Sequence, residues 1–290
     1  MSAAASIRRS REHGFGLIEI LITLVVMAAV LGMVFSALHR SQHQTNRLTN
    51  VAEERQMARA AVQLIERETR MAGSGWGRTV VEGSNNGVPW ALYAVTMGYG
   101  GPAHSDSVTI LGAWQASTTI NAAMPTSSSI IDVASVDGFA PGDLVIITDP
   151  DNKSAHLFEC TAINTSTNHI QHNPSSPYNE PGGHNGWPSS GYPTGSFVYK
   201  VTMSTYWYDS TAYRKPVLMR REAGKAAQIV AYNVDGFHVW YELQDGTWTR
   251  DPGTLTFVDK VIPVVLTRVT DSRLPTLRDS VWAAVRPRTF

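Results

Sequence analysis

Two hydrophobic patterns follow one another at the start of the chain. Residues 15–38 are almost wholly apolar, with Glu19 as their single charge. At ~1.5 Å per residue, a helix over this run is roughly 36 Å long, enough to cross the ~30 Å hydrocarbon core of a bilayer with some tilt. Residues 39–71 are polar but periodic, which predicts an amphipathic helix. The apolar face of that helix comprises Leu48, Val51, Ala58, Val62, Ile65 and Ala72.

The two patterns belong to one predicted helix. No proline occurs before Pro89, so nothing interrupts the helical hydrogen bonds between them. We expect the charged residues of the second half, Glu54 and Glu68 among them, on its solvent faces, where i,i+3 and i,i+4 pairs are available. Gly73-Ser-Gly75 ends the helix. The prediction is one continuous helix of about 57 residues that begins at Phe15.

From Trp76 onward, short β-branched and aromatic runs alternate with stretches rich in Gly, Pro, Asn, Asp and Ser. This spacing predicts a mostly antiparallel β domain, so the fold class is α+β: a long N-terminal helix packed on a large β-rich globular domain. Pro263 should place its strand at a sheet edge or a bulge. The predicted strands are Ser107–Leu111, Ser129–Val133, Leu144–Thr148, Leu157–Thr161, Phe197–Met203, Ser204–Tyr208, Val217–Arg220, Phe237–Tyr241, Val261–Leu266 and Val281–Val285.

Charge and cysteine content add two constraints. The formal net charge is +0, so no global field attracts nucleic acid or an anionic membrane. Arg8, Arg9 and Arg11 precede the apolar run, and by the positive-inside rule they keep the N-terminus cytoplasmic and send the rest of the chain across the membrane. Cys160 is the single cysteine, so no intrachain disulfide can form, and we expect it to pack as a small hydrophobe.

Glu19 is costly inside an apolar helix. An acid at the bilayer centre costs on the order of 3 kcal/mol on insertion scales, and no residue of the run carries a positive charge. Its partner must therefore come from another molecule, or from a new amine made by cutting the chain. A plain signal anchor, with Glu19 near the cytoplasmic interface, is the alternative. An ordinary secretory signal predicts a shorter apolar core that ends in a small-residue cleavage site.

The junction of basic head and apolar run reads Gly14-Phe15-Gly16-Leu17-Ile18-Glu19. It resembles the type III signal of type IV pilins and pseudopilins, G-F-x-L-x-E, although the family usually has Thr where Gly16 stands. The resemblance implies that a prepilin peptidase cuts after Gly14 and N-methylates Phe15. It also implies that Glu19, the fifth mature residue, pairs with the terminal ammonium of a neighbouring subunit. A buried pair of this kind sets the axial step rather than adding net stability.

Scattered features of the globular part resemble PilW-type minor pilins. They are Arg70-Met-Ala-Gly73 after the helix, Gly142–Asp149 followed by Ala155–Thr161, and Leu218-Met-Arg-Arg221 before a late strand. The resemblance implies a single-pass inner-membrane protein with a periplasmic globular domain, which enters an extracellular pilus filament and takes part in pilus assembly, priming or tip function. Its implied partners are other minor and major pilins, the prepilin peptidase, the inner-membrane assembly platform and the membrane.

The same resemblance divides the chain into four expected segments. Residues 1–14 are the leader peptide, and residues 15–38 are the transmembrane and filament-core helix. Residues 39–72 are the amphipathic helix docked on the globular domain, and residues 73–290 are the β-rich domain. Many major pilins close their C-terminal loop with a disulfide, which a chain with one cysteine cannot do.

Two stretches contain residues with the chemistry of metal ligands. His39 and His43 have i,i+4 spacing, but no third ligand lies near them in sequence, and a solvated helix explains them better. Asp149-Pro-Asp151-Asn152 lacks the twelfth-position Glu of an EF-hand, so it predicts a turn. We expect no metal and no cofactor.

A third stretch, residues 164–196, is rich in Asn, Ser, Pro and Gly and predicts a long loop. A metal site there would use His169, His172, His184 and Glu180. Composition favours a solvated, mobile loop instead.

Four functions remain open, with the minor pilin foremost. A type II secretion minor pseudopilin shares the same N-terminal signal, and the sequence separates the two poorly. A membrane-tethered enzyme has no support from a nucleophile elbow, zincin helix, P-loop or Rossmann fingerprint, so we expect no catalytic residue. A DNA- or surface-binding tip adhesin would use a basic cluster that a solvated hairpin explains better: Tyr213, Arg214, Lys215, Arg220, Arg221 and Lys225.

Overall fold

The computed structural model describes residues 16–85, 88–98, 106–113, 115–126, 130–151, 153–174, 176–179, 187–211, 215–251, 258–271 and 274–287. The chain divides into two compact units, Met1–Val51 and Ala52–Phe290. The described part of the first unit is helix apart from Gly16. The second unit contains the end of the same helix and all described strands. The predicted α+β class, a long apolar N-terminal helix and a large β-rich, mostly antiparallel domain, is confirmed.

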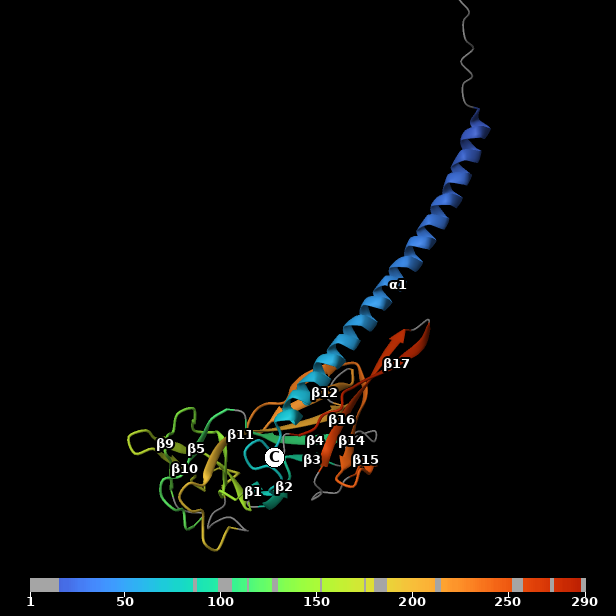
Figure 1. The fold of residues 1–290 in the computed structure, drawn as a ribbon. Coiled ribbons are helices and arrows are strands. Elements are labelled where there is room, and N and C mark those ends of the chain that lie inside the picture. Colours follow the sequence, from blue (N-terminus) through green and yellow to red (C-terminus); the bar gives the residue numbers. More distant parts are fainter. Residues whose placement is uncertain are drawn as a thin grey trace, which may run out of the picture. The chain divides into compact units, whose positions relative to one another are not determined.

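Helix α1 spans Leu17–Met71, which is 55 residues without a break (Figure 1). The prediction of one long helix is thus confirmed over the described residues, and Phe15 lies outside them. The helix ends where its glycine signal predicts. Gly73 adopts a positive φ of 74°, which a residue with a side chain rarely tolerates, and its amide donates to the carbonyl of Leu111 at 3.1 Å. The end of the helix is therefore fixed to a strand of the globular domain.

The buried face of α1 is confined to its last part, from Glu54 to Thr69. Ala58, Val62 and Ile65 lie on it as predicted. Leu48, which we expected on the same face, is 70% exposed. Ala58, Val62 and Ile65 pack with aromatic and β-branched residues of the globular domain, so the second half of the helix is part of the main hydrophobic core.

The prediction that Glu54 and Glu68 lie on solvent faces is wrong. Their side chains are nearly inaccessible, with residue exposures of 7% and 6%. The three- and four-residue periodicity placed them next to the apolar stripe, but the sequence does not show the polar partners that strands far along the chain provide. Those partners are described below.

The strands of the globular domain form three sheets. The largest has the order β13-β12-β11-β7-β8-β1-β2, with β3, β4 and β5 attached. Its members are β1 Val81–Asn85, β2 Val88–Leu92, β3 Val95–Gly98, β4 Ser107–Gly112, β5 Ser117–Thr119, β7 Leu144–Thr148, β8 Ala155–Glu159, β11 Phe197–Asp209, β12 Val217–Glu222 and β13 Gln228–Tyr232. The smaller sheets are β6 Ile131–Asp132, β10 His169–Gln171 and β9 Ala162–Asn164, and β15 Trp248–Thr249, β14 Val234–Leu243, β16 Val258–Asp271 and β17 Leu274–Trp282.

Strand β11 connects the two halves of the large sheet. Its first residues pair with β7 and β5, and its last residues pair with β4 and β12. The sequence analysis divided it into Phe197–Met203 and Ser204–Tyr208, but the structure shows one strand of 13 residues. A long strand shared in this way joins the core under α1 to a second core, which contains Phe158, Cys160 and Tyr192.

Other sequence predictions are confirmed with shifted ends. Strands β4, β7 and β12 begin where predicted, whereas β8 begins two residues early, at Ala155. Part of Ser129–Val133 lies outside the described residues. The stretch 164–196 is not one loop, because His169–Gln171 forms β10 and pairs with β9.

Pro263 lies in β16, between β14 and β17, so the prediction of an edge strand is wrong. Its missing N–H is nevertheless accommodated. Val261 exchanges two backbone hydrogen bonds with Val285, and residue 263 points to the same side because hydrogen-bonding direction alternates along a strand. Strand β17 ends at Trp282, opposite Val264, so the proline nitrogen faces an interruption of the ladder.

Candidate functional site

Glu19 lies in the first turn of α1, which begins with hydrogen bonds from the amides of Glu19 and Ile20 to the carbonyl of Gly16, at 3.0 and 3.3 Å. A carboxylate in the first turn interacts favourably with the helix dipole. Among the described residues, no side chain forms an ion pair or a hydrogen bond with the Glu19 carboxylate. Gly14 and Phe15, the predicted cleavage and methylation residues, lie outside the described part of the chain.

The apolar run that contains Glu19 presents an exposed surface as far as Leu38. Leu17, Ile18 and Phe35 are 82%, 75% and 68% exposed, and the other large apolar residues up to Leu38 are also exposed. By length and composition the helix can cross a membrane, and its most apolar window is 0% buried within the protein. Such a continuous apolar surface indicates an environment of lipid or other apolar helices.

The second half of α1 contains two buried acids, Glu54 and Glu68. Glu68 Oε1 accepts hydrogen bonds from Arg220 on β12, at 2.6 Å from Nη2 and 3.0 Å from Nε. The Arg220 Nη2 also donates to Ser204 Oγ at 2.9 Å. The side chains of Arg220 and Glu68 are only 16% and 8% exposed, so this pair is largely shielded from water.

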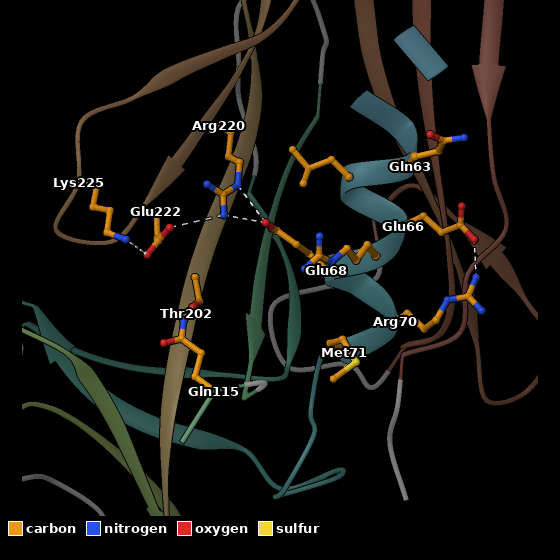
Figure 2. Close-up of a pocket in the computed structure, with 12 residues that line it drawn as sticks. Gln63, Glu66, Glu68, Arg70, Met71, Gln115, Thr202, Arg220, Glu222 and Lys225 are labelled. Carbon is orange, nitrogen blue, oxygen red and sulfur yellow. Dashed lines mark hydrogen bonds and ion pairs between the residues drawn. The ribbon is translucent and has the colours of Figure 1, made fainter. Parts of the chain in front are cut away.

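An open cleft of about 710 Å³ lies beside this pair (Figure 2). Figure 2 shows the charged chain along one wall, from Glu68 to Arg220 and then through Glu222 to Lys225. On the helix side, Arg70 pairs with Glu66 one turn earlier. Most of the charges that line the cleft are thus paired within the chain, and Arg67 lines it as well.

Glu54 is held differently. Its Oε1 accepts a hydrogen bond from Asn233 Nδ2 at 2.7 Å, and Oε2 is buried without a partner among the described residues. Burial raises the pKa of Glu54, while the Asn233 hydrogen bond and the charge of Lys215 counteract part of that effect. The next residue, Arg55, is exposed and pairs with Asp279 of β17 at 2.6 Å.

The predicted basic cluster does not form a basic surface among the residues described. Arg220 is buried against Glu68, and Lys225 pairs with Glu222 at 2.5 Å. Arg221 lies 5.8 Å from the ring centroid of Trp207. Tyr213 and Arg214 lie outside the described residues. Arg220 and Lys225 are thus paired with carboxylates of the same chain, so they add less to a cationic surface than the sequence predicted.

The residues considered as metal ligands in the globular domain have other structural roles where the structure describes them. The turn after β7 is confirmed: Asp149 accepts from the amide of Lys153 at 2.7 Å, and Asp151 pairs with the Lys153 amine. His169 lies in β10, whereas His172 stacks on Phe158 with centroids 4.7 Å apart. Glu180, His184 and Asn152 lie outside the described residues.

No group of three or more His, Cys, Asp or Glu side chains within the described ranges is placed to hold a metal ion. The structure does bring the rings of His39 and His43 into contact. Cys160 is buried, as predicted for a small hydrophobe, and burial raises the pKa of its thiol to about 11.

A buried histidine was missed by the sequence analysis. His156 Nδ1 lies 2.6 Å from the Tyr192 hydroxyl, and Nε2 lies 3.3 Å from Glu82 Oε2. Glu82 and His156 are neighbours on β1 and β8, a parallel pair. The arrangement links the two strands and satisfies a ring that is 1% exposed, which accounts for it as part of the fold.

An aromatic face on the C-terminal sheet was missed as well. Trp240, Trp248 and Trp282 are 42%, 42% and 62% exposed. Trp240 faces Ile262 across the β14–β16 ladder, and Trp282 faces Val264 across the β16–β17 ladder. Side chains alternate along a strand, so the outer face carries His238, Trp240 and Glu242 of β14 and Lys260, Ile262 and Val264 of β16. The same alternation can be read from the sequence. If the apolar Val239 is assigned to the buried face, its neighbour Trp240 must lie on the outer face.

Comparison with known proteins identified a known motif in the N-terminal region. A family model described as the prokaryotic N-terminal methylation motif matches residues 9–35. The matched segment includes Gly14, Phe15 and Glu19. It indicates a prepilin signal, and hence a substrate of the prepilin peptidase machinery of type IV pilins and pseudopilins. Comparisons with curated proteins and with solved structures gave no match.

Proposed function

We propose that this protein is a minor type IV pilin of the PilW type, which takes part in pilus assembly or priming and is not an enzyme. The observation that carries the proposal is the methylation motif over residues 9–35, which includes Glu19. Glu19 is the single carboxylate of the exposed apolar run, and it has no ion-pair partner among the described residues. In this proposal the peptidase cuts after Gly14 and methylates Phe15. The helix is held in the inner membrane until the subunit enters the filament.

The physical reason for assembly is the unsatisfied Glu19. Cleavage after Gly14 creates an ammonium at Phe15, which is the type of partner that a carboxylate in an apolar environment needs. We propose that Glu19 pairs with the ammonium of a neighbouring subunit, because that contact also sets the axial step.

Two features of the globular domain support the PilW assignment. Arg70-Met-Ala-Gly73 and Leu218-Met-Arg-Arg221 are distant in sequence, yet Arg70, Met71 and Arg220 line the same cleft (Figure 2). Residues from the two PilW-like motifs thus lie around one cleft. The exposed tryptophan face offers a second contact surface for neighbouring filament subunits, since exposed tryptophans dominate many protein–protein interfaces.

The test is mass spectrometry of the protein purified from its host. We expect a chain that begins at Phe15 with one added N-terminal methyl group. A bulky replacement of Gly14 should leave an uncut precursor that migrates more slowly. A native protein that retains residues 1–14, or that begins after Leu38, would contradict the proposal.

A type II secretion pseudopilin remains the second candidate, because the matched motif is shared by both systems. The discriminating experiment is a deletion strain in which surface pili and secreted proteins are measured together. The minor-pilin proposal expects loss of pili with normal secretion. Loss of secretion with normal pili would assign the chain to the secretion system instead.

A further inference from the structure

His39 and His43 lie one turn apart on α1, directly after the apolar run ends at Leu38. Both residues are exposed. Their Nε2 atoms are 3.1 Å apart, and the two rings meet edge to face with centroids 4.5 Å apart. The two Nε2 atoms therefore face each other on the exposed surface of the helix, and one donates a hydrogen bond to the other.

That separation fits a shared metal ion. Imidazole nitrogen binds zinc at about 2.0–2.1 Å. If an ion lies at this distance from both Nε2 atoms, which are 3.1 Å apart, the N–metal–N angle is about 98°. This angle lies between the roughly 90° of octahedral and the roughly 109° of tetrahedral coordination. Small ring rotations reach either geometry without any change in the backbone.

The surrounding sequence selects the class of ion. No Asp or Glu occurs between Glu19 and Glu53, while Arg40 and Arg47 lie close to the pair along the chain. Hard cations such as Mg²⁺ and Ca²⁺ prefer oxygen ligands, above all carboxylates. This part of the helix has no carboxylate side chain. Imidazole favours Zn²⁺, Ni²⁺ and Cu²⁺.

We propose that His39 and His43 form a two-imidazole chelate for a divalent transition-metal ion of the Zn²⁺, Ni²⁺ and Cu²⁺ class. In the free protein, one Nε2 donates a proton to the other. When the ion binds, the donor ring moves that proton to its Nδ1, so that both Nε2 lone pairs face the metal and both neutral rings keep one proton. The remaining coordination positions face solvent and are filled by water or by a ligand from another molecule.

The test is a calorimetric titration of the full chain, without an affinity tag and in non-ionic detergent micelles, with ZnCl₂ and then NiCl₂. We expect one ion per chain, and affinity at least about tenfold weaker in His39→Ala and in His43→Ala, because each leaves a single imidazole. Proton competition should weaken binding as the pH falls. MgCl₂ should neither bind nor compete.

Two control variants separate the chelate from general histidine binding. The pair His43→Gln and Gln44→His keeps the number of histidines but moves one ring off the shared face, so it should bind as weakly as His43→Ala. The pair His169→Ala and His172→Ala should bind like the parent chain. Zinc should also protect His39 and His43 from acylation by diethyl pyrocarbonate, as mapped by mass spectrometry.

Equal affinity in the parent chain and in the variant lacking both His39 and His43 would overturn the proposal. So would full affinity in the variant with His at position 44. The proposal does not depend on the pilin assignment, because the titration uses the purified chain and makes no use of assembly.

Discussion

The two halves of α1 solve the same electrostatic problem in different ways. The second half has carboxylates that are buried in the protein. The first half has one carboxylate in an apolar run, where we expect little water. In the second half, Glu54 and Glu68 find Asn233 and Arg220 within their own chain. In the first half, Glu19 has no ion-pair partner among the described residues, and the apolar side chains around it are exposed.

The difference separates folding from assembly. A buried acid with an intrachain partner is satisfied when the chain folds, so its replacement should change the stability of the isolated protein. An acid without an intrachain partner is satisfied only when another molecule arrives. Its replacement should leave the isolated protein intact and change what that protein can join. The predictions below test this division, beginning with the largest effect.

The first prediction concerns Glu19→Ala. We expect normal processing and normal stability of the purified protein, but a strong loss of surface pili. The variant leaves the ammonium of a neighbouring subunit unpaired in an apolar core, which costs about 3–5 kcal/mol for a buried pair. Shed pili and immunoblots of the membrane fraction measure assembly and processing separately. Normal piliation in this variant would refute the pairing role of Glu19.

The second prediction concerns the acid that is satisfied within the chain. Arg220→Ala leaves Glu68 buried without its charge partner and should lower the free energy of unfolding by about 3 kcal/mol. The measurement is urea denaturation in non-ionic detergent, followed by tryptophan fluorescence.

Arg221→Ala is the matched control for Arg220, since Arg221 only lies over the Trp207 ring. It should cost less than about 1 kcal/mol. The double change of Glu68→Leu with Arg220→Leu should be less destabilising than Arg220→Ala, because it leaves no buried charge. Equal losses in the Arg220 and Arg221 variants would show that the buried pair does not hold the helix.

The third prediction asks whether the globular domain, like the first half of α1, has a surface completed by another subunit. Trp240→Ala and Trp282→Ala should weaken assembly by about 2 kcal/mol per contact without changing the unfolding midpoint, because both side chains are exposed. Tyr232→Ala, an exposed aromatic residue on β13, is the control. Full piliation by both tryptophan variants would indicate that the face serves no subunit contact.

The fourth prediction is a pH effect at Glu54. Burial raises the pKa of Glu54 above its ordinary value of 4.5, so the folded state binds the Glu54 proton more tightly than the unfolded state does. This contribution to stability is fully present below pH 4.5 and is lost as the pH rises through the elevated folded pKa. Glu54→Gln keeps an acceptor for Asn233 and removes the charge.

We therefore expect Glu54→Gln to gain about 1 kcal/mol over the parent chain at pH 7.5 and nothing at pH 4. Unfolding midpoints across that pH range measure the difference. Glu53→Gln, the exposed neighbour, should show no pH-dependent gain. A gain of equal size at both pH values would mean that ionisation of Glu54 is not its source.

Much of the fold was readable in the sequence because local rules decided it. The apolar run, the absence of proline and the glycines after Met71 fixed one long helix and its end. Runs of β-branched residues such as Leu144–Thr148 and Ser107–Leu111 became buried strands. Short strands such as Ser117–Thr119 escaped because two or three residues carry too little periodicity to identify a strand.

The residues of the candidate site also differ in whether the sequence alone could identify them. Glu19, Gly14 and Phe15 could be named from sequence, because a lone acid in an apolar run and its flanking residues form a local signal. Only the tertiary structure decided which charges of the second half are buried, because Arg220 lies 152 positions from Glu68 and Asn233 lies 179 positions from Glu54. Partners so distant leave no periodic trace near the acid. Arg220, one of the cations that the sequence had offered to nucleic acid, is one of these buried partners. Strand pairing also gathered Trp240, Trp248 and Trp282 on one face.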